Sequence, residues 1–397
     1  MSSRLNLMAP EVRNNPYPFY AELRRNTPVC QVDPGGFWAI SRYEDILGVL
    51  KNSKSFSSAA LRPLFRPQWL NHNPVEDSLL VQDPPVHARL RNLIQRAFTP
   101  TSLNRLEPLL RKTSEQLVQD MMPRRSVDIV TDFSLPIPAT AICTLLGLDI
   151  SRRMQFKRWG DVLATASSLP PGDLAGHEEV RTTVRDMEAY LRGVIEQRRR
   201  DLSDDLISTL LQGRVDGEAL TDEELMSFLF LLLPAGTETT AHLLSFSALL
   251  LAEQPELLEQ LRAQPELIPS FVEEVLRFEP PTHGLFRMTI EEVEVGGVRL
   301  PANAMVLLLV GAGNRDEGIF QEAEQFMLGR TGPQGLALGY GIHYCIGAAL
   351  ARLETRVALE ALLPRIRRIK RTSESVQWNA SFLVRGPTTL PVELVPA

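Results

Sequence analysis

The sequence is poor in cysteine, with only Cys30, Cys143 and Cys345 among 397 residues. Such an odd and sparse set cannot form a disulfide framework, which excludes a small secreted scaffold and favours a reducing cytoplasm. Basic residues are also fewer than acidic ones, 42 against 48. Because a nucleic-acid binder usually carries a basic excess, we expect no nucleic-acid partner.

Other common features are missing as well. Residues 1–10 contain no apolar segment of the kind found in a signal peptide, so we expect a cytoplasmic protein. The chain has no internal repeat and no low-complexity linker, and its 44% hydrophobic and 23% charged residues are ordinary for a globular protein. The sequence therefore predicts one domain that spans residues 1–397.

One long apolar run, residues 225–252, raises the question of a membrane span, because its only formal charge is Glu238. Its centre also contains a proline, a glycine and several hydroxyls, and its start is acidic rather than basic. Thr221 and Glu224 have the spacing of a capping box, which marks a helix start. We expect a long buried helix over 221–252 and no membrane anchor.

The remaining patterns predict a mainly α protein with small β-sheets. Hairpin signals place short strands at 29–32 with 37–40 and at 293–295 with 298–300. Residues 61–80 predict a long irregular segment of the kind that often covers a binding site. Helical patterns cover 43–51, 85–98, 102–122, 133–146, 152–166, 178–200, 255–263, 265–278 and 346–363.

Cys345 lies at the expected start of the last helix, after a loop that contains Gly339 and Gly341. Glycines let the loop curl its N–H groups toward the sulfur, and the helix N-terminus favours a thiolate. Gly347 leaves room for a flat group close to the backbone. On this pattern alone Cys345 is either a reactive or metal-ligating cysteine or a buried structural one.

Three further patterns carry polar groups that chemistry could use. Glu238 and Thr239 lie in the middle of the apolar helix, where an acid and a hydroxyl form either a proton relay or a buried cluster that only bends the helix. Two shorter patterns are weak by themselves, because such pairs more often form a solvated helix face. They are the pair Glu274 and Arg277, and the pair His87 and Arg91.

Taken together, these motifs resemble the cytochrome P450 family of the soluble bacterial kind. The family order and spacing are followed by 235–240, by Glu274-x-x-Arg277 and by the run from Gly339 through His343 and Cys345 to Gly347. The resemblance covers essentially the whole chain. It implies the cytochrome P450 fold, with a long central helix over a haem b.

The resemblance also implies roles for individual residues. Cys345 matches the proximal ligand of the haem iron, which is the only metal expected. Glu238 and Thr239 match the acid–alcohol pair that supplies protons for O2 activation. Other haem-contacting positions match Ala235, Gly236, Gly339, Gly347 and the propionate-binding set His87, Arg91, Arg287 and His343. Glu274, Arg277 and Arg330 match a structural ion network that braces the cysteine loop.

The implied activity is that of a monooxygenase that inserts one oxygen atom of O2 into a hydrophobic organic substrate, by hydroxylation or epoxidation. Electrons would come from a ferredoxin and a ferredoxin reductase, and the protein would be a monomer. A peroxide-driven peroxygenase and a non-oxygenating haem protein of the same fold are the alternatives, and Glu238 with Thr239 favours O2. The substrate itself cannot be read from the sequence. Its pocket is expected to be lined by Leu231, Pro234, Ala235, Thr282 and Leu285.

Three positions depart from the family pattern, and one of them is Gly335, where soluble members often have histidine. Leu338 stands where the loop usually has phenylalanine, which leaves the redox potential open. Pro234 stands in the central helix where an aliphatic residue is common. Because proline removes a backbone hydrogen bond, we expect the helix to bend between Phe230 and Thr240, with Pro234 on the wall of the pocket.

Overall fold

A computed structural model describes residues 4–96, 98–124, 126–166, 169–170, 172–215, 217–373 and 375–397. The chain forms two compact units. Unit one comprises the chain up to Ser57, Leu109–Ile137 and Thr239–Ala397, and unit two comprises Ser58–Pro108 and Pro138–Glu238. That all 397 residues act as a single domain stays a prediction.

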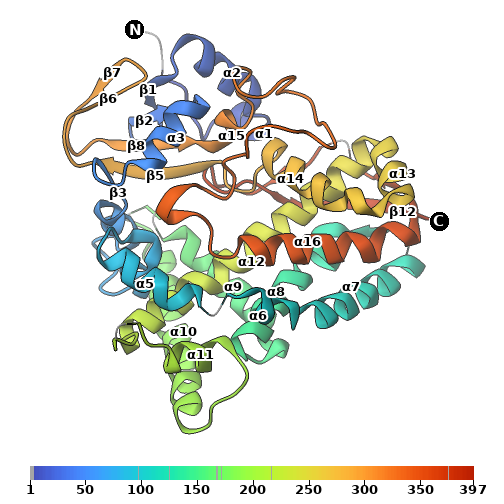
Figure 1. Cartoon of the computed structure of the whole chain (residues 1–397), viewed down its shortest axis with the longest axis horizontal. Helices are drawn as coiled ribbons and strands as arrows, with labels where there is room; N and C mark the ends of the chain where they lie inside the picture. The colour runs from blue at the N-terminus through green and yellow to red at the C-terminus, as the bar shows by residue number, and fades with distance from the viewer. Residues whose placement is uncertain are drawn as a thin grey trace. The chain divides into compact units, whose positions relative to one another are not determined.

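Unit one contains a five-stranded sheet with the order β1-β2-β8-β5-β3 (Figure 1). Strand β2 pairs in parallel with β8, and the other pairs are antiparallel. The predicted strands β1 (Val29–Val32) and β2 (Phe37–Ile40) are confirmed. The sequence missed β3 (Phe56–Ser57), β5 (Gly284–Thr289) and β8 (Met305–Leu309). Strand β8 is buried along nearly its whole length, so it shows no alternation that would identify a strand.

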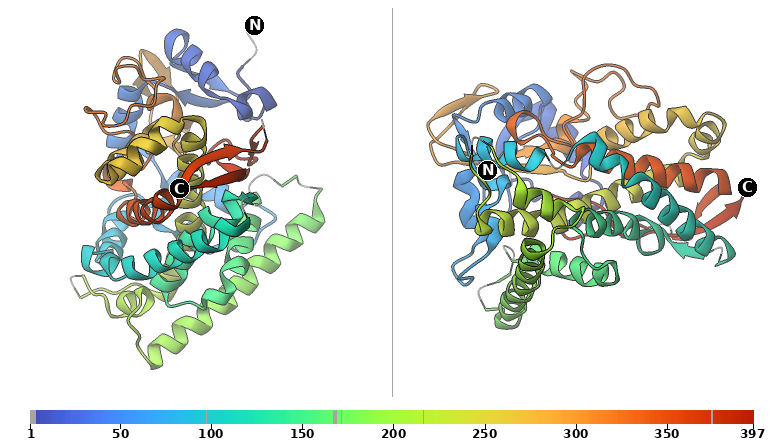
Figure 2. Two further views of the ribbon diagram at one scale, coloured as in Figure 1. Left: turned by 90° about the vertical axis from the view of Figure 1, so that its right-hand side faces the viewer. Right: turned by 60° about the horizontal axis from the view of Figure 1, so that its bottom comes forward.

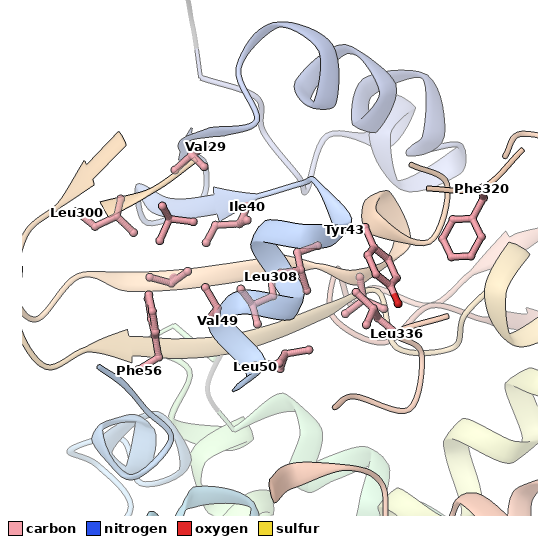
Figure 3. Close-up of a cluster of buried hydrophobic side chains, with 14 of the residues drawn as sticks. Val29, Ile40, Tyr43, Val49, Leu50, Phe56, Leu300, Leu308, Phe320 and Leu336 are labelled. Carbon is pink, nitrogen blue, oxygen red and sulfur yellow. The ribbon is translucent and has the colours of Figure 1, made fainter. Parts of the chain in front are cut away.

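Helix α3 (Tyr43–Lys51), which was predicted with the same bounds, shares a hydrophobic core with this sheet. Figure 3 shows Tyr43, Val49 and Leu50 of α3 among the side chains of Ile40 and Leu308 from the sheet. Each large apolar side chain buried in this way stabilises the fold by about 1.5–3 kcal/mol. The cluster extends to Leu336, close to the cysteine loop, so the sheet and α3 give that loop a rigid support.

The described residues of unit one also form three smaller sheets. The C-terminal sheet, part of which is drawn as red arrows in Figure 2, has the order β4-β12-β9, and the sequence did not predict it. Its strands are β4 (Ser126–Asp128), β9 (Ile366–Arg371) and β12 (Pro391–Pro396). The predicted hairpin of β6 (Val293–Val295) and β7 (Val298–Leu300) is confirmed, with both turn glycines at positive φ. Strand β10 (Gln377–Trp378) pairs with β11 (Pro387–Thr389).

The helices of unit one mostly match the sequence patterns. The predicted helix 265–278 begins with a 3₁₀ turn, and the predicted helix 102–122 is interrupted, so that α7 begins only at Glu107. These helices are α1 (Pro10–Asn14), α2 (Tyr17–Asn26), α7 (Glu107–Met121), η4 (Met122–Arg124), the π-helical turn η5 (Val130–Ser134), α13 (Pro255–Ala263), η7 (Pro265–Leu267), α14 (Ile268–Phe278), α15 (Val310–Gly313), η8 (Gly341–His343), α16 (Ala348–Leu362) and η9 (Leu363–Arg365).

The named elements of unit two, among its described residues, are all helices or helical turns. The segment 61–80, predicted as irregular, has short helical turns on either side of a non-helical stretch at 66–73. The ion pairs Arg62–Asp77 and Arg66–Glu76 join its two ends. Helix α10 begins earlier than predicted because Asp173 caps it by accepting from the N–H of Gly176. The elements are η1 (Ala59–Leu61), α4 (Arg62–Phe65), η2 (Pro74–Asp77), η3 (Leu79–Val81), α5 (Val86–Gln95), α6 (Pro100–Asn104), α8 (Pro136–Leu146), η6 (Ile150–Arg152), α9 (Arg153–Thr165), α10 (Leu174–Arg200) and α11 (Leu206–Gln212).

The long helix α12 runs from Asp222 to Glu253. The predicted capping box is confirmed, because the N–H of Glu224 donates to Thr221 Oγ1 at 3.1 Å and the N–H of Thr221 donates to Glu224 Oε2 at 2.9 Å. The helix continues through Pro234, whose Cβ lies 3.0 Å from where a side chain on Gly160 of α9 would begin. A bend at Pro234 stays a prediction. Among the described residues, no helix is long and apolar enough to cross a membrane.

Candidate active site

The loop before α16 presents Cys345 at the start of that helix. Gly339 and Gly341 have φ values of +71° and +67°, a conformation that glycine adopts without strain. A Cβ on Gly341 would lie 2.8 Å from the carbonyl oxygen of Leu50, so this position is also too close to α3 for a side chain. The N–H of Cys345 donates to the carbonyl of Leu338 at 2.9 Å, which closes the loop. The loop is therefore held in one shape with Cys345 exposed.

The surface next to the thiol is open. Beyond the adjoining residues, the heavy atom nearest to a Cβ on Gly347 would be the Cys345 sulfur, at 3.9 Å. Within 4 Å and among the described residues, a Cβ on Gly339 would meet only the carbonyl oxygen of His343, at 3.5 Å. Gly347 is also the residue that precedes the first turn of the 15-residue helix α16. A flat group can therefore approach the sulfur and the helix N-terminus without meeting side chains from these two positions.

A buried ion network braces the segment that leads to this loop. Arg277 forms a bidentate pair with Glu274, at 2.8 Å and 2.7 Å, and each side chain is only 3% exposed. Arg330 donates to the same carboxylate at 3.0 Å and 3.1 Å, and the N–H of Met327 donates to it at 2.9 Å. The structure thus joins the three residues that the sequence assigned to an ion network, and it ties α14 to the chain between 314 and 330.

Sequence reasoning gave no function to Asn314, although this side chain links the network to the loop. Its Oδ1 accepts from the N–H of Leu336 at 2.6 Å, and its Nδ2 donates to the carbonyl of Leu276 at 3.3 Å. Asn314 is fully buried. The signal that could have identified it is its place at the start of the polar run Asn314-Arg315-Asp316, directly after a long apolar segment.

Helix α12 has one face that is less buried than the others. Leu231, Glu238 and Thr239 are half-buried and Ala235 is exposed, while most other positions of the helix are buried. These residues recur at the helical spacing of three and four and therefore share one face. Gly236 does not leave a bare surface, because Ile142 of α8 fills the space where its side chain would be. The glycine at position 236 thus serves helix packing.

The basic residues assigned to propionate binding lie on separate elements. In unit two, His87 is buried and Arg91 is half-buried, four residues apart on α5. In unit one, Arg287 is 7% exposed on β5 and donates from Nη1 to the carbonyl of Phe286 at 2.7 Å, and His343 is half-buried in η8.

Comparison with known proteins decides the family. Residues 5–373 match the sequence model of the family described as Cytochrome P450. The chain is 37% identical over 385 residues to mycinamicin IV hydroxylase/epoxidase from Micromonospora griseorubida, which covers 94% of each chain. The chain belongs to the cytochrome P450 family. It is accordingly a haem-thiolate monooxygenase that carries haem b and uses O2 to hydroxylate or epoxidise an organic substrate.

Solved structures of P450s show the same fold. Cytochrome P450 CYP109Q5 from Chondromyces apiculatus superposes with a TM-score of 0.92 at 39% identity, over 100% of both chains. CYP109E1 from Bacillus megaterium, in complex with testosterone, gives a TM-score of 0.88 at 34% identity, over 96% of this chain and 98% of that one. The predicted fold class, a mainly α P450 fold with small sheets, is confirmed.

The residues of this P450 fit the haem that the family carries. An exposed thiol stands beside two glycines that leave the surface open, which is the shape a flat macrocycle needs. When bound, the haem supplies the activation of O2. The chain itself holds the cysteine loop rigid through α3, Asn314 and the network around Glu274.

Helix α16 also contains a fully buried acid, Glu354, whose two carboxyl oxygens have no hydrogen-bond partner among the described residues. Burial raises its pKa well above the ordinary value, so the folded protein keeps the carboxyl protonated. Below the ordinary pKa both the folded and the unfolded chain bind this proton. As the pH rises above it, only the unfolded chain releases the proton, so stability falls by about 1.4 kcal/mol per pH unit until the folded pKa is reached.

We therefore expect Glu354→Gln to be more stable than the wild type at neutral pH, with a difference that grows as the pH is raised. Urea unfolding of both proteins over a series of pH values measures this difference. If the free energies of unfolding of the two proteins changed with pH in parallel, Glu354 would ionise normally in the folded protein.

Proposed function

We propose that Cys345 is the residue that ligates the haem iron. The observation that carries this assignment is an exposed thiol at the N-terminus of α16, held by a loop with two left-handed glycines. A helix N-terminus favours negative charge, and the thiolate is the form that binds iron. Cys143 is buried in α8, which argues against it as a ligand.

The Cys345→His variant tests this assignment. We expect the reduced protein with carbon monoxide to lose the red-shifted Soret band of thiolate ligation and to show the band of histidine ligation. Cys30→Ser is the matched control, because Cys30 is half-buried in β1, and its spectrum should equal that of the wild type. A wild-type band in Cys345→His would assign the ligand to another residue.

Glu238 and Thr239 are proposed as the pair that delivers protons during O2 activation. Both are half-buried on the less buried face of α12, so each side chain is accessible in a helix that is otherwise mostly buried. An acid next to a hydroxyl can pass a proton by general acid catalysis. The propionates are proposed to bind His87, Arg91, Arg287 and His343, because arginine binds a carboxylate in a bidentate way. Ala235, Gly236, Gly339 and Gly347 are proposed to contact the haem through their backbones.

A bulky hydrophobic molecule is proposed as the substrate. The proposed lining residues Leu231, Pro234, Thr282 and Leu285 are half-buried and mostly apolar. One relative is named as a mycinamicin hydroxylase/epoxidase, and the structure of another contains testosterone. Screening macrolides, steroids, terpenoids and fatty acids for the low-to-high-spin shift of the haem would identify the class. Binding of fatty acids alone would contradict a bulky substrate.

Ferredoxin and ferredoxin reductase are proposed as the electron donors of a monomeric, cytoplasmic enzyme. The stretch 351–371, which contains most of α16 and β9, has seven basic and two acidic residues, and 87–112 has six and one. Such basic surfaces attract an acidic partner, and the attraction weakens as salt increases. Several of these residues also form ion pairs within the chain, among them Arg352 with Glu273 and Arg356 with Glu360.

We expect the triple variant with glutamine at Arg96, Arg352 and Arg356 to accept its first electron from an acidic ferredoxin more slowly, with unchanged substrate affinity. Glutamine is preferred to glutamate because it does not repel Glu273 and Glu360. Stopped-flow reduction at low and high salt measures the rate, and Arg200→Gln, 82% exposed on α10, is the control. Equal rates at both salt concentrations would contradict electrostatic docking.

A further inference from the structure

One buried titratable side chain of α12 is not part of the function proposed above. His242 is 8% exposed, more than any other residue of 241–250. It follows Glu238 by four residues and Thr239 by three, and residues with these spacings are neighbours on a helix surface. His242 therefore extends the less buried face of α12 by one turn, directly beyond the proposed acid–alcohol pair.

The segment 379–386, between β10 and β11, holds the imidazole of His242 in place. Asn379 Nδ2 lies 3.5 Å from His242 Nε2 and donates to the carbonyl of Val384 at 2.9 Å. The N–H of Asn379 donates to the carbonyl of Gly386 at 3.0 Å. A Cβ on Gly386 would overlap Nδ1 of His242, so glycine at this position leaves the room that the ring occupies. The position of the ring is therefore set by its surroundings before any reaction begins.

The neighbours of His242 along the helix are apolar. Ala241, Leu243 and Leu244 are all buried, and an imidazole costs more free energy to bury among them than an apolar side chain would. Within residues 240–252, His242 is also the only side chain that gains and loses a proton near neutral pH. An imidazole at this position is better explained by proton chemistry than by packing.

The monooxygenase reaction needs protons in every turnover. When one oxygen atom of O2 is inserted into a C–H bond, the other oxygen atom is reduced to water, which consumes two electrons and two protons. A proton that Glu238 gives up must be replaced before the acid can act again. The next group along the same helix face that can carry a proton is His242.

We propose that His242 passes protons to Glu238 and so returns the acid to its protonated form. This role of His242 rests on the function proposed above for Glu238 and Thr239. The imidazolium of His242 releases its proton to the Glu238 carboxylate, which leaves a neutral imidazole and a neutral carboxylic acid. The imidazole then takes up a proton from water, and no other bond forms or breaks. Asn379 is a positioning residue, since it contacts the ring but carries no proton itself.

His242→Gln tests this role, because glutamine keeps a polar side chain of similar length that cannot carry a proton. In the haem-loaded variant we expect the product formed per NADH to fall about tenfold and hydrogen peroxide to rise in its place. Haem content and the spin shift on substrate binding should stay as in the wild type. The solvent deuterium isotope effect on product formation should increase, which a purely structural change would not cause. The substrate is the compound that gives the largest spin shift in the screen described above.

A double-variant cycle shows whether His242 acts through Glu238. If the proton passes from one to the other, His242→Gln should cause no further loss of product once Glu238→Gln is present. The free energies of unfolding in urea of the same four haem-loaded proteins should also be non-additive, because side chains that interact are coupled. Additive losses in either measurement would mean that the two side chains act separately, and would overturn the proposal.

Ser245→Ala is the matched control. Ser245 is a fully buried polar residue of α12, three positions beyond His242, whose Oγ donates to the carbonyl of Ala241 at 2.8 Å, and its variant should form product as the wild type does. Should His242→Gln lose haem, His242→Asn repeats the test with a smaller amide. Wild-type product formation in the His242 variant, with loss of product in Glu238→Gln, would refute the role of His242 alone. Wild-type product formation in Glu238→Gln would refute the proposed role of Glu238 as well.

Discussion

Glu274→Gln is expected to lower the free energy of unfolding by about 3–5 kcal/mol and to reduce the haem content of the purified protein. Glu274 is the only carboxylate that Arg277 and Arg330 are seen to contact among the described residues, and it also accepts from the N–H of Met327. Glutamine leaves the buried Arg277 charge without compensation. Because this network holds the segment before the cysteine loop, its loss should also loosen the loop.

The neighbouring residue provides a matched control. Glu273 is on the same turn of α14, but its side chain is 45% exposed and pairs with Arg352 near the surface. Glu273→Gln should therefore cost less than about 1 kcal/mol and leave the haem content unchanged. Urea unfolding and the ratio of haem to protein measure both effects. Equal losses in the two variants would mean that the buried network does not brace the loop.

Thr239→Ala is expected to separate electron consumption from product formation. Substrate binding and NADH oxidation should continue, while product formation falls by about 10²–10⁴ and hydrogen peroxide is released instead. The physical reason is that alanine cannot donate or relay a proton, whereas the helix backbone and the pocket stay unchanged. Product, NADH and peroxide are measured in the same reaction.

Two other variants show whether the hydroxyl itself is responsible. Thr239→Ser keeps a hydroxyl and should restore most of the coupling. Thr237→Ala removes a hydroxyl two residues away, one that is buried and donates to the carbonyl of Leu233 at 2.9 Å, and it should remain coupled. A similar loss of coupling in Thr237→Ala would attribute the effect to helix distortion rather than to proton delivery.

The sequence predicted the elements that depend on local chemistry. The capping box at Thr221, the hairpin around Gly296 and Gly297, and helix α3 are local patterns, and the structure contains all three. Strand β8 was missed because it is buried on both faces and shows no alternation. The C-terminal sheet was missed because β9 is rich in arginine and becomes a strand only through its partner β12, more than twenty residues away.

For the site, as for the fold, the sequence predicted local pairings but not which residues are buried. The i, i+3 spacing suggested that Glu274 and Arg277 pair, but by itself it could not separate a solvated pair from a buried one. Their burial depends on Arg330 and on the chain around Asn314, which sequence spacing does not place. Gly236 is a second example: nothing in the neighbouring sequence indicated that Ile142 of α8 fills the space where a side chain at this position would be. Whether such residues are buried or exposed depends on contacts between segments that are distant in the sequence.

The carbon monoxide difference spectrum of the reduced, purified wild-type protein shows whether a cysteine thiolate ligates the haem iron. An iron-bound thiolate at Cys345 should give the strongly red-shifted Soret band that only thiolate ligation produces. A band at the position typical of histidine-ligated haem, or a protein without haem, would contradict the account.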